Sequence, residues 1–185
     1  MRDLVPTPGQ TVGPFFHDAL PYADGPHPAP PGVPGTIRLH GTVYDGSGAP
    51  VPDALLEIRQ ADASGRVPHV EGSLRRDGRF TGWARVATDA GGRYAITTVE
   101  PAPTREGTAA HFAVTVFARG LLDRLFTRIY LPGPAADTDP LLTSLPVERR
   151  RTLVAMRDDD GDLTHDIHLQ GEHETVFISF PAHNR

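Results

Sequence analysis

Short segments of alternating hydrophobicity, each closed by a turn rich in glycine or aspartate, fill the sequence from residue 36 onward. In residues 36–44, for example, apolar side chains alternate with Arg38, His40 and Thr42. A period of two is typical of a strand that buries one face. About eight such strands are expected: residues 36–44, 55–60, 83–87, 94–99, 111–118, 125–130, 163–169 and 175–180. The pattern predicts a mainly β fold, an antiparallel β-sandwich.

The first 35 residues lack a strand or helix period and contain nine prolines. Because proline fixes φ and removes a backbone donor, we expect residues 1–35 to form an extended arm, followed by a sandwich domain at residues 36–185. The arm carries apolar anchors that a solvated tail would not need, so we expect it to dock on a partner or on the sandwich. These anchors are Val12, Phe15, Phe16, Leu20 and Tyr22.

One short helix is expected late in the chain, at residues 146–156. Pro146 suits an early helical position, and Glu148 lies near the positive end of the helix dipole. The three arginines at residues 149–151 are typical of a solvated face, so we assign them no chemistry.

Composition excludes several classes of function. The net charge of −5 gives no basic surface for a polyanion, so we expect no nucleic-acid partner. The sequence has no cysteine, which excludes disulfides and thiolate metal sites, and no lysine, which excludes a Walker-type nucleotide loop. Without an apolar run of about 18 residues or a signal-peptide pattern, we expect no membrane span and a cytoplasmic location.

Two polar clusters resemble metal sites but have the wrong spacing. His165 and His168 are three residues apart on an expected strand, so they point to opposite faces and do not easily share one ion. A calcium loop that begins at Asp158 would need glycine at its sixth position, where Leu163 stands. We interpret His165 as a structural residue and residues 158–162 as an acidic turn between helix and strand.

Longer motifs connect the chain to a known family. They lie in residues 41–65, with Gly41-Thr42-Val43-Tyr44-Asp45 at their start, and in residues 88–101 and 166–177. In these motifs the chain resembles the iron-dependent intradiol ring-cleaving dioxygenases over nearly its whole length. The resemblance implies a β-sandwich of the intradiol dioxygenase core type. The chain departs from the family at Arg59, where the family usually has tryptophan.

The resemblance also implies a vacant metal site. In that family two tyrosines and two histidines hold Fe(III), and phenolate and imidazole suit this ion chemically. Their positions correspond here to Thr104, to His111 and Ala113, and to the loop before residue 77, where no tyrosine occurs. At most His111 remains, so the resemblance implies no metal in this chain and a structural role for His111.

One branch of the family divides the work between two related chains, and the motifs at residues 7–15 and 117–120 resemble its iron-free α-type chain. This resemblance implies an iron-bearing β-type partner that holds Fe(3+), in a hetero-oligomer of αβ pairs. It implies that no catalytic residue lies within this chain alone. Thr11, Gly13, Pro14 and Arg119 would instead line the partner's active site. The implied reaction is cleavage of protocatechuate by O2 to 3-carboxy-cis,cis-muconate, in aromatic catabolism.

The physical chemistry of the substrate agrees with that arrangement. Protocatechuate has a carboxylate opposite its hydroxyls, so its groove needs a donor and a positive charge away from the metal. Thr11 offers a hydroxyl and Arg119 a fixed charge. From the residues alone, Arg119 is equally an ordinary turn or interface arginine. Two alternatives stay open: a transthyretin-like sandwich that acts as a binding or structural module, and an α-type subunit for another catechol.

Overall fold

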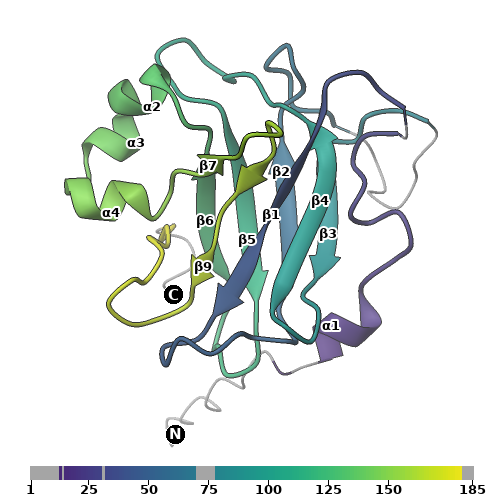
Figure 1. Ribbon diagram of the computed structural model, residues 1–185, viewed down its shortest axis with the longest axis vertical. Coiled ribbons are helices and arrows are strands. Elements are labelled where there is room, and N and C mark those ends of the chain that lie inside the picture. The colour runs from purple at the N-terminus through teal and green to yellow at the C-terminus, as the bar shows by residue number, and fades with distance from the viewer. Residues whose placement is uncertain (1–12, 14, 31, 70–77, 181–185) are drawn as a thin grey trace, which may run out of the picture.

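The computed structural model describes residues 13, 15–30, 32–69 and 78–180. They form two β-sheets that pack face to face, with four short helices at the edges (Figure 1). The expected mainly β sandwich is therefore confirmed. The strands are β1 (Thr36–Tyr44), β2 (Leu55–Gln60), β3 (Trp83–Ala87), β4 (Arg93–Val99), β5 (His111–Phe117), β6 (Leu125–Tyr130), β7 (Met156–Arg157), β8 (Leu163–Thr164) and β9 (Ile167–His168).

The first sheet has the strand order β4-β1-β8-β7, and β9 also pairs with β1. β1 and β4 are antiparallel, with Gly41 opposite Tyr94. β8 and β9 run parallel to β1, with Leu39 opposite Leu163. The antiparallel pairing expected for the sandwich holds for β1 with β4 and for β7 with β8, and the two short parallel pairs were not expected. The chain leaves the second sheet after β6, crosses to the first, and returns beside β1 in the same direction.

The second sheet is antiparallel throughout, in the order β3-β2-β5-β6. Arg59 lies opposite Trp83 on one side and Ala113 on the other, and Ala113 lies opposite Arg128. Residues directly opposite one another project on the same face of a sheet. Since their neighbours along the strands, such as Ile58, are buried in the core, this row of four lies on the outer face.

The inner faces of both sheets meet in one hydrophobic core. Their alternating apolar positions are the ones that the sequence pattern predicts, and removal of this surface from water is the main stabilising contribution. The largest fully buried members of the core are Leu39, Leu56, Ile58, Ile96, Phe112, Ile129, Leu163 and Ile167.

The last strands are shorter than expected. Residues 163–169 do not form one strand, because the chain breaks between β8 and β9 at His165, whose backbone N–H bonds the His40 carbonyl at 2.8 Å. Residues 175–180 form no strand in the described structure. They approach the sandwich through separate contacts, such as the Ile178 N–H bond of 2.7 Å to the Phe126 carbonyl.

The helices also correct the sequence interpretation, which expected only one. They are α1 (Phe15–Ala19), α2 (Pro134–Thr138), α3 (Pro140–Thr143) and α4 (Val147–Arg151). α4 stops well before residue 156 because the backbone beyond it pairs with the end of β6. There the Tyr130 N–H bonds the Leu153 carbonyl at 2.7 Å, and the Ala155 N–H bonds the Tyr130 carbonyl at 2.9 Å. No helix among the described residues is long and apolar enough to cross a membrane.

The described part of the N-terminal segment lies against the sandwich. Its carbonyls accept backbone hydrogen bonds from both sheets: the Gly25 carbonyl from the Arg85 N–H of β3, and the Pro26 carbonyl from the Thr97 N–H of β4, both at 2.9 Å. Ala29 is buried beside these contacts. Proline has no backbone N–H group to donate, but its carbonyl can still accept a hydrogen bond. The segment therefore docks on the sandwich through its carbonyl oxygens.

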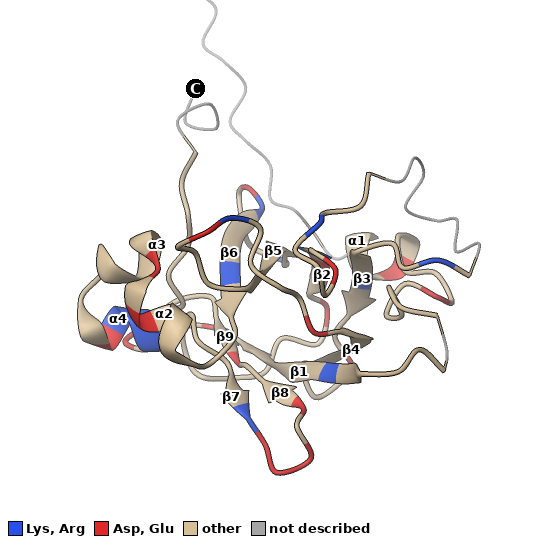
Figure 2. Ribbon diagram, turned by 90° about the horizontal axis from the view of Figure 1, so that it is seen from above, with Lys and Arg blue, Asp and Glu red and all other residues tan. Residues whose placement is uncertain are grey.

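The aspartates at residues 158–162 lie between β7 and β8, and not between a helix and a strand as expected (Figure 2). Asp158 Oδ1 accepts hydrogen bonds from the backbone N–H groups of Asp160, at 3.1 Å, and Asp162, at 2.8 Å. Asp162 Oδ1 in turn accepts from the Arg38 N–H at 2.8 Å. These carboxylates hold a tight turn and attach it to β1.

Candidate functional site

Two of the positions that correspond to metal ligands lie on the outer face of the second sheet. His111 and Ala113 project from β5 into a pocket of about 250 Å³, which Arg59, Trp83, Phe126 and Arg128 also line. Thr104 is exposed in the turn before β5 and is not among the described residues that line this pocket. The structure therefore brings together two of the three named positions.

His111 is packed as a structural side chain. Its Nδ1 lies 3.2 Å from the Ala109 carbonyl, and its ring lies against Tyr130 with 5.2 Å between ring centroids. Burial lowers the pKa of His111, and the nearby Arg128 charge lowers it further. The imidazole is thus held neutral, with one nitrogen directed at the backbone.

The residues around His111 do not fit a ferric ion. Ala113 supplies no ligand atom, and the two residues opposite it, Arg59 and Arg128, are cations that would repel the metal. Among the described residues, no group of three or more His, Cys, Asp or Glu side chains could hold a metal ion.

The sequence interpretation missed Arg128, and it noted Arg59 only as a departure from the family that touches no site residue. The structure corrects this, because both arginines lie directly opposite Ala113. Arg128 Nη1 donates a hydrogen bond of 3.0 Å to the Tyr130 hydroxyl. The Arg59 guanidinium lies 5.3 Å from the centre of the Trp83 ring. The two arginines flank Ala113 because of the register of the strands. The sequence alone could not reveal this, because it does not show that β2 pairs with β5 or that β5 pairs with β6.

Two of the four expected substrate-lining residues, Gly13 and Arg119, are described, and neither lines the pocket over Ala113. Thr11 and Pro14 lie outside the described residues. Gly13 has φ near 72°, in the left-handed region that favours glycine. Three residues later the Phe16 ring stacks on Phe117 at the end of β5, with centroids 5.2 Å apart and planes 11° apart. This stack fixes the segment after Gly13 close to the turn that carries Arg119.

Arg119 forms a salt bridge that the sequence did not reveal. Its Nη2 lies 2.7 Å from Asp53 Oδ2, and the Arg119 side chain is 62% exposed whereas that of Asp53 is only 13% exposed. Asp53 Oδ1 is buried and has no hydrogen-bond partner among the described residues. A guanidinium has five N–H donors, so one carboxylate contact leaves donors of Arg119 facing solvent.

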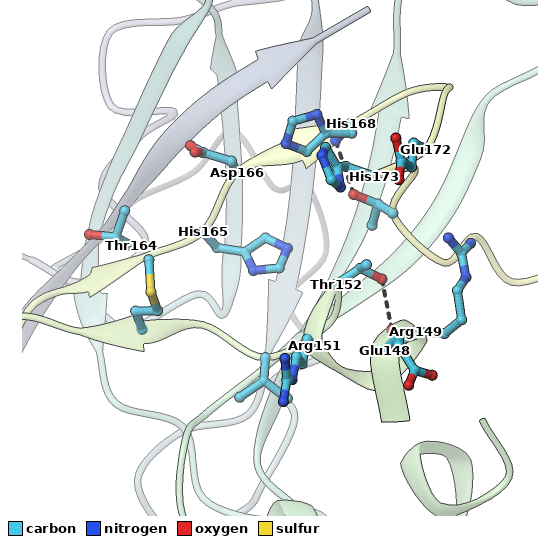
Figure 3. Close-up of a pocket in the computed structure, with 13 residues that line it drawn as sticks. Glu148, Arg149, Arg151, Thr152, Thr164, His165, Asp166, His168, Glu172 and His173 are labelled. Atoms are coloured by element: carbon cyan, nitrogen blue, oxygen red, sulfur yellow. Dashed lines mark hydrogen bonds between the residues drawn. The ribbon is translucent and has the colours of Figure 1, made fainter. Parts of the chain in front are cut away.

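A larger pocket, of about 510 Å³, lies between α4 and the β8–β9 segment (Figure 3). Its lining includes His165, His168, Thr152 and Arg149. In Figure 3 the His165 ring extends from the strand segment toward Thr152. His165 is 5% exposed and His168 is half-buried. The expectation that the two side chains point to opposite faces is wrong here, because the strand breaks at His165 and both side chains line this one pocket.

His165 is a neutral, buried side chain in this pocket. Burial lowers its pKa to about 4, and the nearby Asp166 carboxylate offsets only part of that effect. Its Nε2 has no hydrogen-bond partner among the described residues. The interpretation of His165 as structural agrees with this packing. The described residues of the pocket include no group of three His, Cys, Asp or Glu side chains placed to hold a metal ion.

Comparison with known proteins gives concordant results for nearly the whole chain. A family model described as Dioxygenase matches residues 11–171. The chain is 40% identical to the protocatechuate 3,4-dioxygenase alpha chain of Burkholderia cepacia, over 96% of this chain and 99% of that one. It is 33% identical to the protocatechuate 3,4-dioxygenase beta chain of the same species, over 64% of this chain and 54% of that one.

A solved structure supports the fold alone. The dioxygenase domain of a dioxygenase carbohydrate-binding protein fusion from Streptomyces sp. SirexAA-E superposes with a TM-score of 0.59. The match covers 90% of this chain and 99% of that one, at 24% identity. The two-sheet arrangement described above is therefore similar to that of a dioxygenase domain.

Proposed function

Because the chain belongs to the intradiol dioxygenase family, we propose that it is the α-type subunit of a protocatechuate 3,4-dioxygenase. In this proposal a homologous β chain holds Fe(3+), and the two chains together cleave protocatechuate with O2 to 3-carboxy-cis,cis-muconate. The transthyretin-like module is not favoured, since the family match extends from residue 11 to residue 171.

One pair of observations carries the proposal. The chain matches a relative named as an alpha chain over 99% of that relative, so the similarity is not confined to a shared domain. At the same time Arg59, Ala113 and Arg128 stand together at the expected metal position, where a ferric ion does not fit. A chain with this family's fold and without its metal site needs a partner for the family's chemistry.

The proposed role of this chain is to complete the partner's active site. Thr11, Gly13, Pro14 and Arg119 would line it, with Arg119 directed at the substrate carboxylate. Two contacts support this assignment: the Phe16–Phe117 stack, which holds the N-terminal segment beside the Arg119 turn, and the Asp53 bridge, which limits the motion of the guanidinium. The positive charge would orient protocatechuate, and the substrate hydroxyls would face the partner's iron.

The division of the chain into an arm at residues 1–35 and a domain at residues 36–185 follows from the same proposal. The arm would extend from the sandwich to the partner, and residues 25–30 would be its anchor, since their carbonyls bond β3 and β4. A cytoplasmic location, the number of αβ pairs and the preference for protocatechuate over other catechols stay predictions.

The experiment compares the chain produced alone with the chain produced together with a β chain of this family. We expect the chain alone to contain little iron and to show no oxygen uptake, and the complex to contain iron and to consume O2 with protocatechuate. Iron bound stoichiometrically by the isolated chain, with activity, would refute the proposal. Catechol, which lacks the carboxylate, serves as the comparison substrate. Faster oxygen uptake with catechol than with protocatechuate would favour the alternative, an α-type subunit for another catechol.

A matched variant shows which chain holds the metal. His111→Ala removes the last side chain at this chain's metal position that could act as a ligand. We expect the iron content and the activity of the complex to stay unchanged, because His111 packs against Tyr130 and bonds the backbone. Loss of iron in this variant would place a ligand in the present chain.

A further inference from the structure

We propose that the pocket over Ala113 binds a small aromatic carboxylate. This site would lie within the present chain, at the position where the family's metal does not fit. The inference stands on the geometry of the second sheet and does not depend on the proposed function.

The first support is the row of side chains across three strands. Ala113 lies between Arg59 and Arg128, directly opposite both in the register of the sheet. Neighbouring strands are about 5 Å apart, so the two arginine backbones flank Ala113 with about 10 Å between them. The small alanine leaves the space between the two guanidinium groups open, and its side chain is exposed in this chain.

The second support is charge. Neither Arg59 nor Arg128 pairs with a carboxylate among the described residues; their described partners are the Trp83 ring and the Tyr130 hydroxyl. The carboxylate that lines the same pocket, Glu57, is held by Arg85 at 2.6 Å. Two cationic groups therefore face a pocket in which the one carboxylate among the described lining residues, Glu57, is already paired with Arg85.

The guanidinium groups are also oriented in advance. Stacking on Trp83 restricts Arg59, and the bond to Tyr130 restricts Arg128. A guanidinium presents parallel N–H donors that match the two oxygens of a carboxylate, and ordering the donors before binding lowers the entropic cost. The His111 ring also lines this side of the pocket.

The third support is the apolar part of the lining. Phe126, Ile178 and Phe180 line the same pocket, and Phe126 and Phe180 meet edge to face with 5.3 Å between centroids. Aromatic and aliphatic side chains suit a planar ring. The volume of about 250 Å³ lies just below the roughly 300 Å³ at which pockets for drug-sized ligands begin. These features select a ligand with one ring and one carboxylate.

The test is binding of 4-fluorobenzoate to the purified full-length chain without partner or iron, followed by ¹⁹F NMR and calorimetry. We expect saturable binding that falls about tenfold in Arg59→Gln and in Arg128→Gln, since a charge-assisted hydrogen bond contributes about that factor. Ala113→Leu should abolish binding by filling the space between the arginines. The neutral analogue 4-fluorobenzamide should not bind.

The controls separate this site from general charge attraction and from misfolding. Arg38→Gln removes one positive charge from β1 in the other sheet and should bind as the unmodified chain does. Arg59 is exposed, so Arg59→Gln should keep the thermal unfolding temperature. Equal binding in Arg59→Gln, Arg128→Gln and the unmodified chain, or no saturable binding, overturns the proposal. If sulfate displaced 4-fluorobenzoate and bound with the same affinity, the proposed contribution of the aromatic ring to binding would be overturned.

The outcome is independent of the subunit assignment, since the titration contains no second chain. In the complex, a ligand at the partner's ferric ion would show a paramagnetically broadened fluorine signal, whereas a ligand over Ala113 would show a sharper one. Only the ligand that gives the sharper signal should bind about tenfold more weakly in Arg59→Gln. A sharp signal that titrates with unchanged affinity in this variant would overturn the site.

Discussion

The Tyr94 hydroxyl donates a hydrogen bond of 2.7 Å to the backbone carbonyl of His165, across the strand that separates them. Tyr94 lies opposite Gly41 in the pairing of β4 with β1, and the His165 carbonyl lies directly over Gly41. Because glycine has no side chain, the C-terminal segment can approach β1 at this point. This contact joins β4, β1 and the segment between β8 and β9, and it places the His165 ring in the larger pocket.

Loss of the Tyr94 hydroxyl should destabilise the fold. Tyr94 is 2% exposed and its hydroxyl satisfies the His165 carbonyl, so Tyr94→Phe should lower the free energy of unfolding by about 1–3 kcal/mol. Urea denaturation measures the change. Tyr44→Phe is the matched control, because the Tyr44 hydroxyl has no described hydrogen bond; an equal loss in both variants would contradict the role of the Tyr94 contact.

Gly41→Ala should cost more than an ordinary glycine substitution. The added Cβ would collide with the His165 carbonyl, which is backbone and has little room to move. We expect a loss of about 3 kcal/mol or more, in the range of severe core substitutions. Gly107→Ala provides the comparison, since its φ of 74° adds backbone strain of about 1 kcal/mol but nothing lies near its Cβ. Similar losses in both variants would exclude the proposed collision.

The buried His165 predicts a pH dependence of stability. In the fold its pKa is about 4, below the ordinary value of 6.5, so between these values the unfolded chain binds a proton that the folded chain does not. Stability should therefore be full above pH 6.5, decrease as the pH falls to about 4, and level off below it. The total loss from this group is roughly 3 kcal/mol.

His165→Gln should flatten that part of the stability profile, whereas substitution of the exposed His69 by glutamine should leave it unchanged. Denaturation midpoints between pH 4 and 7 provide the measurement. A slope that is the same in His165→Gln and in the unmodified chain would show that other groups cause it.

The proposed role of Arg119 predicts an effect that depends on the substrate. In the αβ complex, Arg119→Gln should lower kcat/KM for protocatechuate about tenfold, mainly through KM, because one charge-assisted contact to the carboxylate is lost. With catechol, which has no carboxylate, the variant should behave as the unmodified complex does. Asp53→Asn breaks the same salt bridge but keeps the Arg119 charge, so it should change kcat/KM less. Equal effects of both variants on both substrates would assign Arg119 to the interface.

The Phe16–Phe117 stack should hold the N-terminal segment to the sandwich. Phe16→Ala should lower the free energy of unfolding by about 1 kcal/mol and speed limited proteolysis near residue 16, because the aromatic pair is lost. Phe15 is 78% exposed, so Phe15→Ala should leave the stability of the isolated chain unchanged. Equal protease sensitivity in Phe16→Ala and the unmodified chain would contradict an anchoring role.

Part of the fold was predictable from residue order. The alternation of apolar side chains fixed the central strands of both sheets within one or two residues, because a strand with one buried face has a period of two regardless of its partners. The helix expected at residues 146–156 is present as the shorter α4, whereas α2 and α3 were missed despite local signals. Both begin with proline, and Asp139 Oδ1 accepts hydrogen bonds from the N–H groups of Leu141 and Leu142.

The sequence by itself determined the two-faced strands, the turns between them and the absence of enough ligands for iron at the expected positions, since each depends on residue type and spacing along one segment. Only the tertiary structure decided that α4 ends at Arg151, that β8 and β9 run parallel to β1, that Asp53 holds Arg119, and that Arg59 and Arg128 flank Ala113. These features arise from pairing between residues far apart in the chain. Their energies depend on which backbones and charges meet in space, and local propensity does not contain that information.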